Sequence, residues 1–238
     1  MGWRKAAIFG SSGGIGGALV RVLASQGGEV MAGSRSGEGP DLAGVTPFIF
    51  DLDDEGTIAA AAEGWADDPP DLVIVATGVL TLPDGTGPER SFRHVEADAM
   101  ARVLYLNTVG PALVAKHLLP LFPRDGRSVF AAISARVGSI GDNSIGGWHS
   151  YRASKAALNM LVRNYAIELG RTHKQAIAVA LQPGTVDTKL SQPFQSNLPD
   201  GQLTTPEESA ANLLRVLETL TPEDSGFMFD WRGDRLPA

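Results

Sequence analysis

The sequence of 238 residues contains no cysteine. This absence excludes disulfide bonds, thiolate metal sites and a cysteine nucleophile, and it fits a protein of a reducing compartment. Histidine is also scarce. Its four copies are scattered and lack the spacing of metal ligands. We therefore expect a cytoplasmic protein without a metal site.

Long apolar runs are lacking as well. No stretch approaches the ~20 residues that a membrane helix needs, and the apolar residues 6–9 near the start are too few for a signal-peptide core. Lys and Arg number 20 against 27 Asp and Glu, a net charge of -7 that disfavours bulk binding to phosphate backbones. We expect neither a membrane nor a nucleic acid as partner, although one local basic pocket for a small phosphorylated ligand is compatible with this charge.

What is present is an even alternation of short apolar runs and longer amphipathic ones. The pattern predicts strands at 4–9, 29–34, 45–50, 72–76, 128–133, 176–181 and 227–230. Helices are expected at 15–26, 57–65, 97–121, 151–169 and from 206 onward, the third of them bent near Gly110-Pro111. Strands separated by helices predict the α/β class, as a single doubly wound Rossmann-type domain over residues 1–238 with a central parallel sheet of about seven strands.

A glycine-rich turn joins the first expected strand to the first expected helix. Residues 10–16 read Gly-Ser-Ser-Gly-Gly-Ile-Gly, with the spacing Gly-x-x-x-Gly-x-Gly. Glycines at such a junction let the backbone approach a pyrophosphate, and the helix N-terminus offers free N–H groups. The position favours a dinucleotide site over the alternative of a plain tight turn. The expected binding residues are Gly10, Ser12, Gly14, Ile15 and Gly16.

The second expected strand ends at Ser34-Arg35, without an acidic residue. In a dinucleotide site, a carboxylate here would bind the 2′-hydroxyl of the adenosine ribose, whereas an arginine would bind a 2′-phosphate. A solvated arginine in a polar loop is the alternative. Together with the glycine-rich turn, Ser34 and Arg35 favour NADP(H) over NAD(H) as the cofactor.

Tyr151 and Lys155 lie four residues apart in an expected helix, so they share one face of it. A free tyrosine has a pKa of about 10 and is a poor acid–base catalyst at neutral pH. A neighbouring ammonium group favours the phenolate and lowers that pKa. Such a tyrosine can exchange a proton with a carbonyl or alcohol oxygen. The alternative is an ordinary surface pair.

Taken together, these residues resemble the short-chain dehydrogenase/reductase family over nearly the whole chain. The family's landmarks occur in order: the turn at 10–16, Asp51, Ala76-Thr77-Gly78, Asn107, Ser134, Tyr151-x-x-x-Lys155 and Pro183-Gly184-Thr185-Val186-Asp187-Thr188. Segments 134–140 and 183–190 are most similar to the C-factor-like and Sniffer-like carbonyl reductases. The resemblance implies an NADP-dependent oxidoreductase that interconverts a small carbonyl compound and its alcohol.

The resemblance also implies a catalytic set of Asn107, Ser134, Tyr151 and Lys155. In this set the asparagine would hold a water of a proton relay, and the serine would polarise the substrate oxygen. The tyrosine would be the acid/base, and the lysine would lower its pKa and bind the nicotinamide ribose. Asp51 would contact the adenine, and Val186 would meet the nicotinamide carboxamide. The remaining cofactor contacts would come from Leu52, Ala76, Thr77, Gly78, Pro183, Gly184 and Thr188.

One position departs from the family's pattern. The family commonly has a Ser-Ser pair, whose second serine carries the catalytic hydroxyl, where this chain has Ser134-Ala135. We therefore predict that Ser134 supplies the hydroxyl, with Ser139 as the alternative. The departure also keeps a second function open, that of a dinucleotide-binding signalling or regulatory protein with weak or no turnover.

Two further expectations concern the substrate and the assembly. Segment 189–204 is polar and carries Phe194 and Leu198, a composition that suits a lid over an apolar carbonyl compound. Trp148 either lines the substrate pocket or packs beneath it. Because the family often pairs the helices that correspond to 97–121 and 151–169, a homo-oligomer, either a dimer or a tetramer, is expected.

Overall fold

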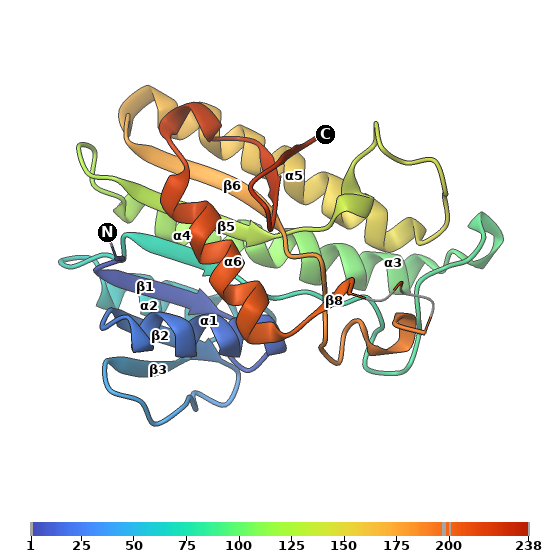
Figure 1. The fold of residues 1–238 in the computed structure, drawn as a ribbon, viewed down its shortest axis with the longest axis horizontal. Helices are drawn as coiled ribbons and strands as arrows, with labels where there is room; N and C mark the ends of the chain where they lie inside the picture. The colour runs from blue at the N-terminus through green and yellow to red at the C-terminus, as the bar shows by residue number, and fades with distance from the viewer. Residues whose placement is uncertain (1, 197–198, 200, 238) are drawn as a thin grey trace.

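The computed structural model describes residues 2–196, 199 and 201–237, and Figure 1 shows a central sheet with helices on both faces. In the described residues the sheet has eight strands in the order β10-β9-β6-β5-β4-β1-β2-β3. The bounds are β1 (Lys5–Phe9), β2 (Glu29–Ser34), β3 (Val45–Ile49), β4 (Leu72–Val75), β5 (Ser128–Ile133), β6 (Ala176–Gln182), β9 (Met228–Asp230) and β10 (Arg235–Leu236).

The pairings confirm the predicted parallel sheet. The strands from β9 to β3 all pair in parallel, and the edge strand β10 alone among them runs antiparallel to β9. The strand order reverses beside β1, since the chain first builds outward to β2 and β3 and then returns to β4. Ligands bind open α/β sheets at such a reversal, beyond the carboxyl ends of the strands.

Helices cover both faces of the sheet (Figure 1). On one face lie α1 (Gly14–Ser25) and α6 (Pro206–Thr219), which also pack against each other. On the other face lie α2 (Glu55–Gly64), α4 (Gly110–Leu118) and α5 (His149–Thr172). The central parallel strands β1, β4, β5 and β6 are therefore buried on both sides, and this explains why they appear in the sequence as nearly continuous apolar runs, whereas the edge strand β3 stays largely exposed.

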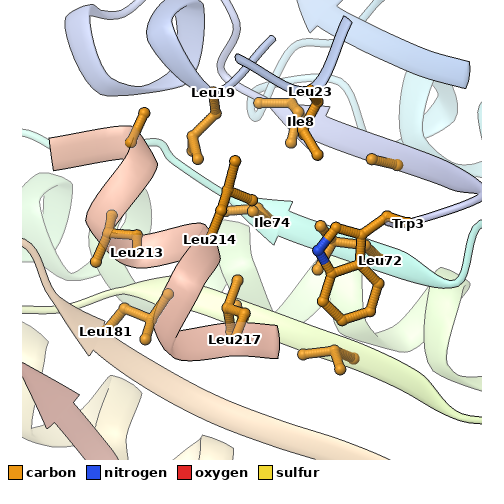
Figure 2. Packing of buried hydrophobic residues seen from close by; sticks show 14 of the residues in the cluster. Trp3, Ile8, Leu19, Leu23, Leu72, Ile74, Leu181, Leu213, Leu214 and Leu217 are labelled. Carbon is orange, nitrogen blue, oxygen red and sulfur yellow. The ribbon is translucent and has the colours of Figure 1, made fainter. Parts of the chain in front are cut away.

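Two apolar clusters hold these layers together. Figure 2 shows the first, in which Leu19 of α1 and Leu214 of α6 meet Ile8 and Ile74 of the sheet. Phe9 and its neighbours on the opposite side of the strands belong to the second cluster, because side chains alternate along a strand. Fully burying one such side chain contributes roughly 1.5–3 kcal/mol.

The expected helix 97–121 is interrupted, and its irregular part lies earlier than predicted. It consists of α3 (Ala97–Leu104), a π-helical turn η2 (Tyr105–Val109), α4 and a short 3-10 turn η3 (Leu119–Leu121). Pro111 directly follows this π-turn, and it cannot donate an i→i−4 hydrogen bond to the carbonyl oxygen of Asn107, four residues before it. Single π-turns often occur at functional sites, and this one contains Asn107.

Candidate active site

The predicted site residues gather at one edge of the sheet, because each follows the carboxyl end of a parallel strand or faces it from a helix. Gly10, Arg35, Asp51, Ala76, Ser134 and Pro183 follow β1, β2, β3, β4, β5 and β6 in that order. Asn107 and Tyr151 reach the same edge from η2 and from the first turn of α5. The fold thus gives a physical reason for the order in which the landmarks occur along the chain.

The glycine-rich turn is packed so closely at Gly10, Gly14 and Gly16 that a side chain at any of them would displace its neighbours. A Cβ at Gly16 would lie 2.2 Å from the carbonyl oxygen of Gly10, and one at Gly14 would lie 2.5 Å from Cγ2 of Thr188. Gly10 has a φ of 100°, a conformation that favours glycine. Ser12 is exposed at the tip of the turn, and Ile15 is half-buried behind it.

The N-terminus of α1 is available to an anion. Its N-cap, Gly13, makes no side-chain cap, and the first turn carries no acidic residue. Nearby, Thr77 packs against Gly10, and its buried hydroxyl has no hydrogen-bond partner among the described residues. A close backbone turn, uncapped N–H groups and an unpaired hydroxyl together fit the phosphates of a dinucleotide.

Ser34 and Arg35 follow each other at the end of β2, but the first is buried and the second is exposed. The Ser34 hydroxyl is buried and donates to the carbonyl oxygen of Glu38 at 2.7 Å, so its hydrogen is already engaged. Arg35 is exposed, and no hydrogen bond or ion pair holds it within the described part of the chain. Of the two predicted residues, the arginine is therefore the one available to a ligand.

Asp51 and Leu52 follow β3 on the same side of the site. Asp51 accepts the backbone N–H of Asp53 at 3.0 Å. Leu52 is buried against Gly110, where a Cβ would lie 2.6 Å from the leucine. The leucine side chain thus joins the end of β3 to the start of α4.

The segment after β6 packs back onto the glycine-rich turn. Gly184 has a φ of 79° and lies against Trp231. Val186 is buried in β7 (Thr185–Val186), which pairs with β8 (Leu203–Thr204), and Thr188 covers Gly14. The two predicted cofactor segments, 10–16 and 183–188, are therefore in direct contact.

Asn107 joins three parts of the site from the π-turn. Its Oδ1 accepts the N–H of Val79 at 2.8 Å, and its Nδ2 donates to the carbonyl oxygen of Val79 and to Oγ of Ser154. Ser154 in turn donates to the carbonyl oxygen of Tyr151 at 2.7 Å. Since both amide hydrogens of the asparagine are engaged, its side chain fixes the segment after β4 against α5.

Tyr151 and Lys155 are buried together at the start of α5. Nζ of Lys155 lies 5.8 Å from the centroid of the Tyr151 ring and donates to the carbonyl oxygen of Ile133 at 2.8 Å. A Cβ at Gly78 would lie 3.4 Å from Oδ1 of Asn107 and 3.5 Å from Nζ of Lys155. The glycine therefore lets the predicted asparagine and lysine approach the end of β4, and the lysine lies beside the Tyr151 ring.

The pKa of Tyr151 shifts in the direction opposite to the one expected. Burial raises the pKa of the Tyr151 hydroxyl to about 12, and it lowers the pKa of the Lys155 ammonium to about 8. The expectation that Lys155 lowers the pKa of Tyr151 is thus not met, because removal from water opposes the phenolate. At neutral pH the tyrosine keeps its proton.

The two candidate hydroxyls lie in different surroundings. Ser134 donates to Oδ1 of Asn159 at 2.7 Å, two helical turns beyond Tyr151 on α5. Ser139 is buried and accepts the N–H of Asp142 at 3.1 Å. It directly follows Gly138, where a Cβ would lie 2.6 Å from Cβ of Lys155. The segment that carries Ser139 is thus in contact with Lys155.

A pocket of about 190 Å³ opens beside Tyr151. Its walls are Leu80, Leu82, Thr86, Gly87, Pro88, Glu89, Arg90, His94, Glu96, Ala99, Val103, Ser150 and Tyr151. No sequence pattern indicates that residues 86–90 line a pocket, because that segment is a Gly/Pro-rich stretch without periodicity. In the described residues no group of three His, Asp or Glu side chains could hold a metal.

Trp148 lies beside this pocket in a strained conformation. Its φ of 50° and ψ of 44° are left-handed, which costs a residue other than glycine of order 1–3 kcal/mol. Its ring meets the rings of Tyr151 and Phe194 edge-on, with centroids 6.2 Å and 5.1 Å away. Trp148 thus joins the tyrosine to the expected lid, of which Leu198 lies outside the described residues.

Comparison with known proteins identifies the family. The profile described as short chain dehydrogenase matches residues 4–199. The chain therefore belongs to the short-chain dehydrogenase family and is an oxidoreductase, as the order of its landmarks predicted. No helix in the described ranges is long and apolar enough to cross a membrane.

Two relatives and two solved structures illustrate the kinship. The chain is 34% identical over 226 residues to 1-hydroxy-2-glutathionyl-2-methyl-3-butene dehydrogenase of Rhodococcus sp. strain AD45, covering 92% of each chain. It is 35% identical over 169 residues to C-signal of Myxococcus xanthus, covering 71% of this chain and 93% of the relative.

Among solved structures, the NADPH-bound carbonyl reductase from chicken fatty liver has a TM-score of 0.85 at 26% identity, covering 100% of this chain and 95% of that one. The carbonyl reductase Sniffer of D. melanogaster shares the fold, with a TM-score of 0.81 at 20% identity over 99% of both chains. The relatives confirm the resemblance to the short-chain dehydrogenases, C-signal among them, and the likeness to Sniffer shows a shared fold.

Proposed function

We propose that the chain is an NADP-dependent carbonyl reductase in which Tyr151 is the acid/base. The convergence of Tyr151, Lys155 and Asn107 behind Gly78 carries this proposal. When bound, the dinucleotide supplies a hydride to the carbonyl carbon, or accepts one from an alcohol. Tyr151 gives its phenolic proton to the carbonyl oxygen, so that the carbonyl becomes an alcohol, and the reverse reaction returns the proton to Tyr151.

The raised pKa of Tyr151 fits the part of a proton donor in the reduction. A hydroxyl whose pKa is about 12 is protonated at neutral pH, which is the state that a proton donor needs. Lys155 keeps a positive charge on the same side of the ring below its pKa of about 8. That charge attracts the negative charge that develops on the phenolic oxygen as its proton leaves.

The cofactor assignment rests on the turn and on the end of β2. The turn at 10–16 and the N-terminus of α1 would bind the pyrophosphate, with Thr77 and Thr188 beside it. Arg35 would bind the 2′-phosphate of NADP, because a guanidinium fork matches phosphate geometry. The relative from chicken liver, whose structure holds NADPH, is consistent with this choice.

The substrate side is the pocket of about 190 Å³ next to Tyr151. Its volume suits a small carbonyl compound, and the leucines at 80 and 82 with Val103 give it an apolar wall. Segment 189–204 acts as the lid through the contact of Phe194 with Trp148. The cytoplasm is the proposed location.

We further propose that the protein assembles as a homo-oligomer. The outer face of α5 exposes Met160 and Ile167, which are seven residues apart and so lie on one side of the helix. Covering them against a second copy would remove apolar surface from water. Light scattering on the purified protein should give the mass of a dimer or tetramer, and the mass of a single chain would refute the assembly.

A second candidate function is a dinucleotide-binding signalling protein with little turnover. Ala135 stands where the family usually has its catalytic serine, and one relative is named C-signal. In this case the chain would bind the cofactor without consuming it. The two candidates share the cofactor site, and only turnover separates them.

Turnover of NADPH with a panel of aldehydes, ketones and quinones tests the proposal. The panel should include the alcohol that names the Rhodococcus relative, assayed with NADP in the direction of oxidation. Substrate-dependent NADPH consumption supports the reductase. NADPH binding by calorimetry without turnover on any member of the panel would favour the signalling candidate.

A further inference from the structure

Glu89 lies in the loop that forms the pocket wall, and it is hydrogen-bonded to the start of α5. Its carboxylate accepts hydrogen bonds from both the N–H and the hydroxyl of Ser150, the N–H at 3.1 Å. Its carbonyl oxygen accepts the N–H of Trp148. Three donors in the turn that precedes Tyr151 are thus satisfied by one residue that lies 61 positions from Ser150 in the sequence.

These hydrogen bonds supply acceptors for the N–H groups at the N-terminus of α5, which have none within the helix. The first N–H groups of a helix have no partners within it, and a side chain at the N-cap usually accepts one of them. Here the N-cap is Trp148, which has no oxygen to offer and makes no side-chain cap. Glu89 takes over that function and places a negative charge at the N-terminus of α5, where the helix dipole favours one.

The charge of Glu89 is maintained at this position. Burial raises the pKa of the Glu89 carboxyl, but the hydrogen bonds from Ser150 and from the backbone of Glu89, together with the charge of His149, hold the pKa below its ordinary value. The carboxylate is therefore ionised at neutral pH, and an ionised acceptor makes the stronger hydrogen bonds.

The same residue keeps a strained turn in place. Gly146, Gly147 and Trp148 all have positive φ, and a left-handed tryptophan persists only where its surroundings fix it. Arg152 adds a second hold, since its Nε donates to the carbonyl oxygen of Gly147 at 3.0 Å. The turn in turn sets the position of Tyr151 and of the Trp148 ring that contacts it.

We propose that Glu89 is a positioning residue for Tyr151, acting through Ser150 and Trp148 to couple the pocket wall to the catalytic helix. This inference rests on the proposed function, since it concerns the same tyrosine. Residues 86–90 line the pocket, so a substrate that contacts this wall contacts the loop that holds the acid/base. A change at the wall is thereby transmitted to Tyr151.

The kinetic test compares Glu89→Ala, Glu89→Gln and the control Asp84→Ala. Asp84 lies in the same loop and has the same charge, but its carboxylate caps only Thr86. Misplacing a catalytic group by about 1 Å can cost ~100-fold, so Glu89→Ala should lower kcat by about 10–100-fold. The Kd of NADPH should stay within about two-fold. Glu89→Gln should recover most of kcat, because its one amide oxygen can accept the N–H of Ser150 while its NH2 group donates to the Ser150 hydroxyl.

A second measurement needs no substrate. Hydrogen exchange of the amides of residues 148–155 should be faster in Glu89→Ala than in the wild type and unchanged in Asp84→Ala. Ser150→Ala, which leaves the backbone bond in place, should show a smaller increase, and it serves if Glu89→Ala does not fold. Unchanged exchange in both the Glu89 and the Ser150 variants would show that Glu89 does not stabilise the N-terminus of α5.

The outcomes separate this inference from the proposed function. Faster exchange with an unchanged kcat would overturn the positioning role, as would a Glu89→Gln variant as slow as Glu89→Ala. Wild-type protein without turnover would overturn the proposed function and the positioning role together, and the exchange result would then decide only whether Glu89 holds the turn.

Discussion

Nζ of Lys155 lies 5.8 Å from the centroid of the Tyr151 ring while it donates to the carbonyl oxygen of Ile133 at 2.8 Å. The lysine therefore has one partner at the end of β5 and one on its own helix. Both residues are buried, and burial pushes their pKa values apart, to about 8 for the lysine and about 12 for the tyrosine. Pairs of titratable groups separated in this way are typical of acid–base sites.

Replacing Tyr151 by phenylalanine removes the proposed proton donor and little else. Turnover should fall by ~10²–10⁴-fold, which is the usual contribution of general acid–base catalysis. The Kd of NADPH should change by less than about two-fold, because the ring remains in place. Initial rates on the best substrate of the panel and a calorimetric titration measure the two quantities.

The matched control is Tyr165→Phe on the same helix. Burial also raises the pKa of Tyr165 to about 12, but its ring packs against Phe130 in the second apolar cluster, between α5 and the sheet. This variant should keep turnover close to that of the wild type. If the two variants lose turnover equally, or if Tyr151→Phe keeps it within a few-fold, the assignment of Tyr151 is wrong.

The lowered pKa of Lys155 predicts that the stability of the protein depends on pH. Its pKa is about 8 in the folded protein and 10.5 in the unfolded chain, so the unfolded state binds more protons between these values. Stability therefore increases with pH across this window. Lys155→Met has no such group, so it should be more stable than the wild type at pH 7, by an order of 1–3 kcal/mol, and this difference should shrink toward pH 10.

Urea unfolding at pH 7, 8, 9 and 10 measures that difference in the free energy of unfolding. Lys116→Met serves as control, because Lys116 is exposed and pairs with Glu55 on the surface. Above pH 10 the raised pKa of Tyr151 acts in the opposite direction, since the folded state then retains the extra proton. A constant difference from pH 7 to 10 would show that Lys155 is not charged and buried as described.

The sequence predicted the sheet and most of the site because both depend on local patterns. Strands buried on both faces appear as apolar runs, and the turn at 10–16 shows its glycines directly. A bend was expected near Gly110-Pro111, but its form, a π-turn around Asn107, was not predicted, because the residues of a π-turn have no distinctive sequence pattern. The edge strand β10 has only two residues, too few for a periodic pattern.

Glu89 was missed for a different reason. Its hydrogen-bond partners are Trp148 and Ser150, and the latter lies 61 positions away in the sequence. A contact between residues so far apart leaves no local pattern in the sequence. The pKa of Tyr151 was misjudged because spacing shows which charge is near but not how far the hydroxyl is removed from water. Burial is a property of the whole fold.

Separate alanine variants of Ser134 and Ser139 identify the substrate-polarising hydroxyl. The sequence favoured Ser134, but that hydroxyl donates to Asn159 in the structure. Loss of a single donor to a developing oxyanion costs ~10²–10³-fold in kcat. We expect Ser134→Ala to show that loss, because Ser134 directly follows Ile133, whose carbonyl oxygen accepts from Nζ of Lys155. The reverse result would assign the role to Ser139, and two active variants would exclude a serine from the role.

Arg35→Asp tests the preference for NADP. The wild type should bind NADP more tightly than NAD, because a guanidinium group can form charge-assisted hydrogen bonds with the 2′-phosphate. Such bonds contribute ~1.5–3 kcal/mol, so the ratio of the two Kd values should change by at least about ten-fold in the variant. Calorimetric titration of both oxidised cofactors into the wild type and the variant gives the ratio directly.

Arg171→Asp makes the same change of charge at the other edge of the sheet, in the last turn of α5. It should leave the ratio unaltered, because exposed charges further apart than the Debye length of about 8 Å are screened at physiological salt. Ser34 should matter less than Arg35, since its hydroxyl hydrogen is already donated to Glu38. Wild-type protein that binds NAD as tightly as NADP would refute the preference itself. A preference that survives in Arg35→Asp would instead assign the 2′-phosphate to another group.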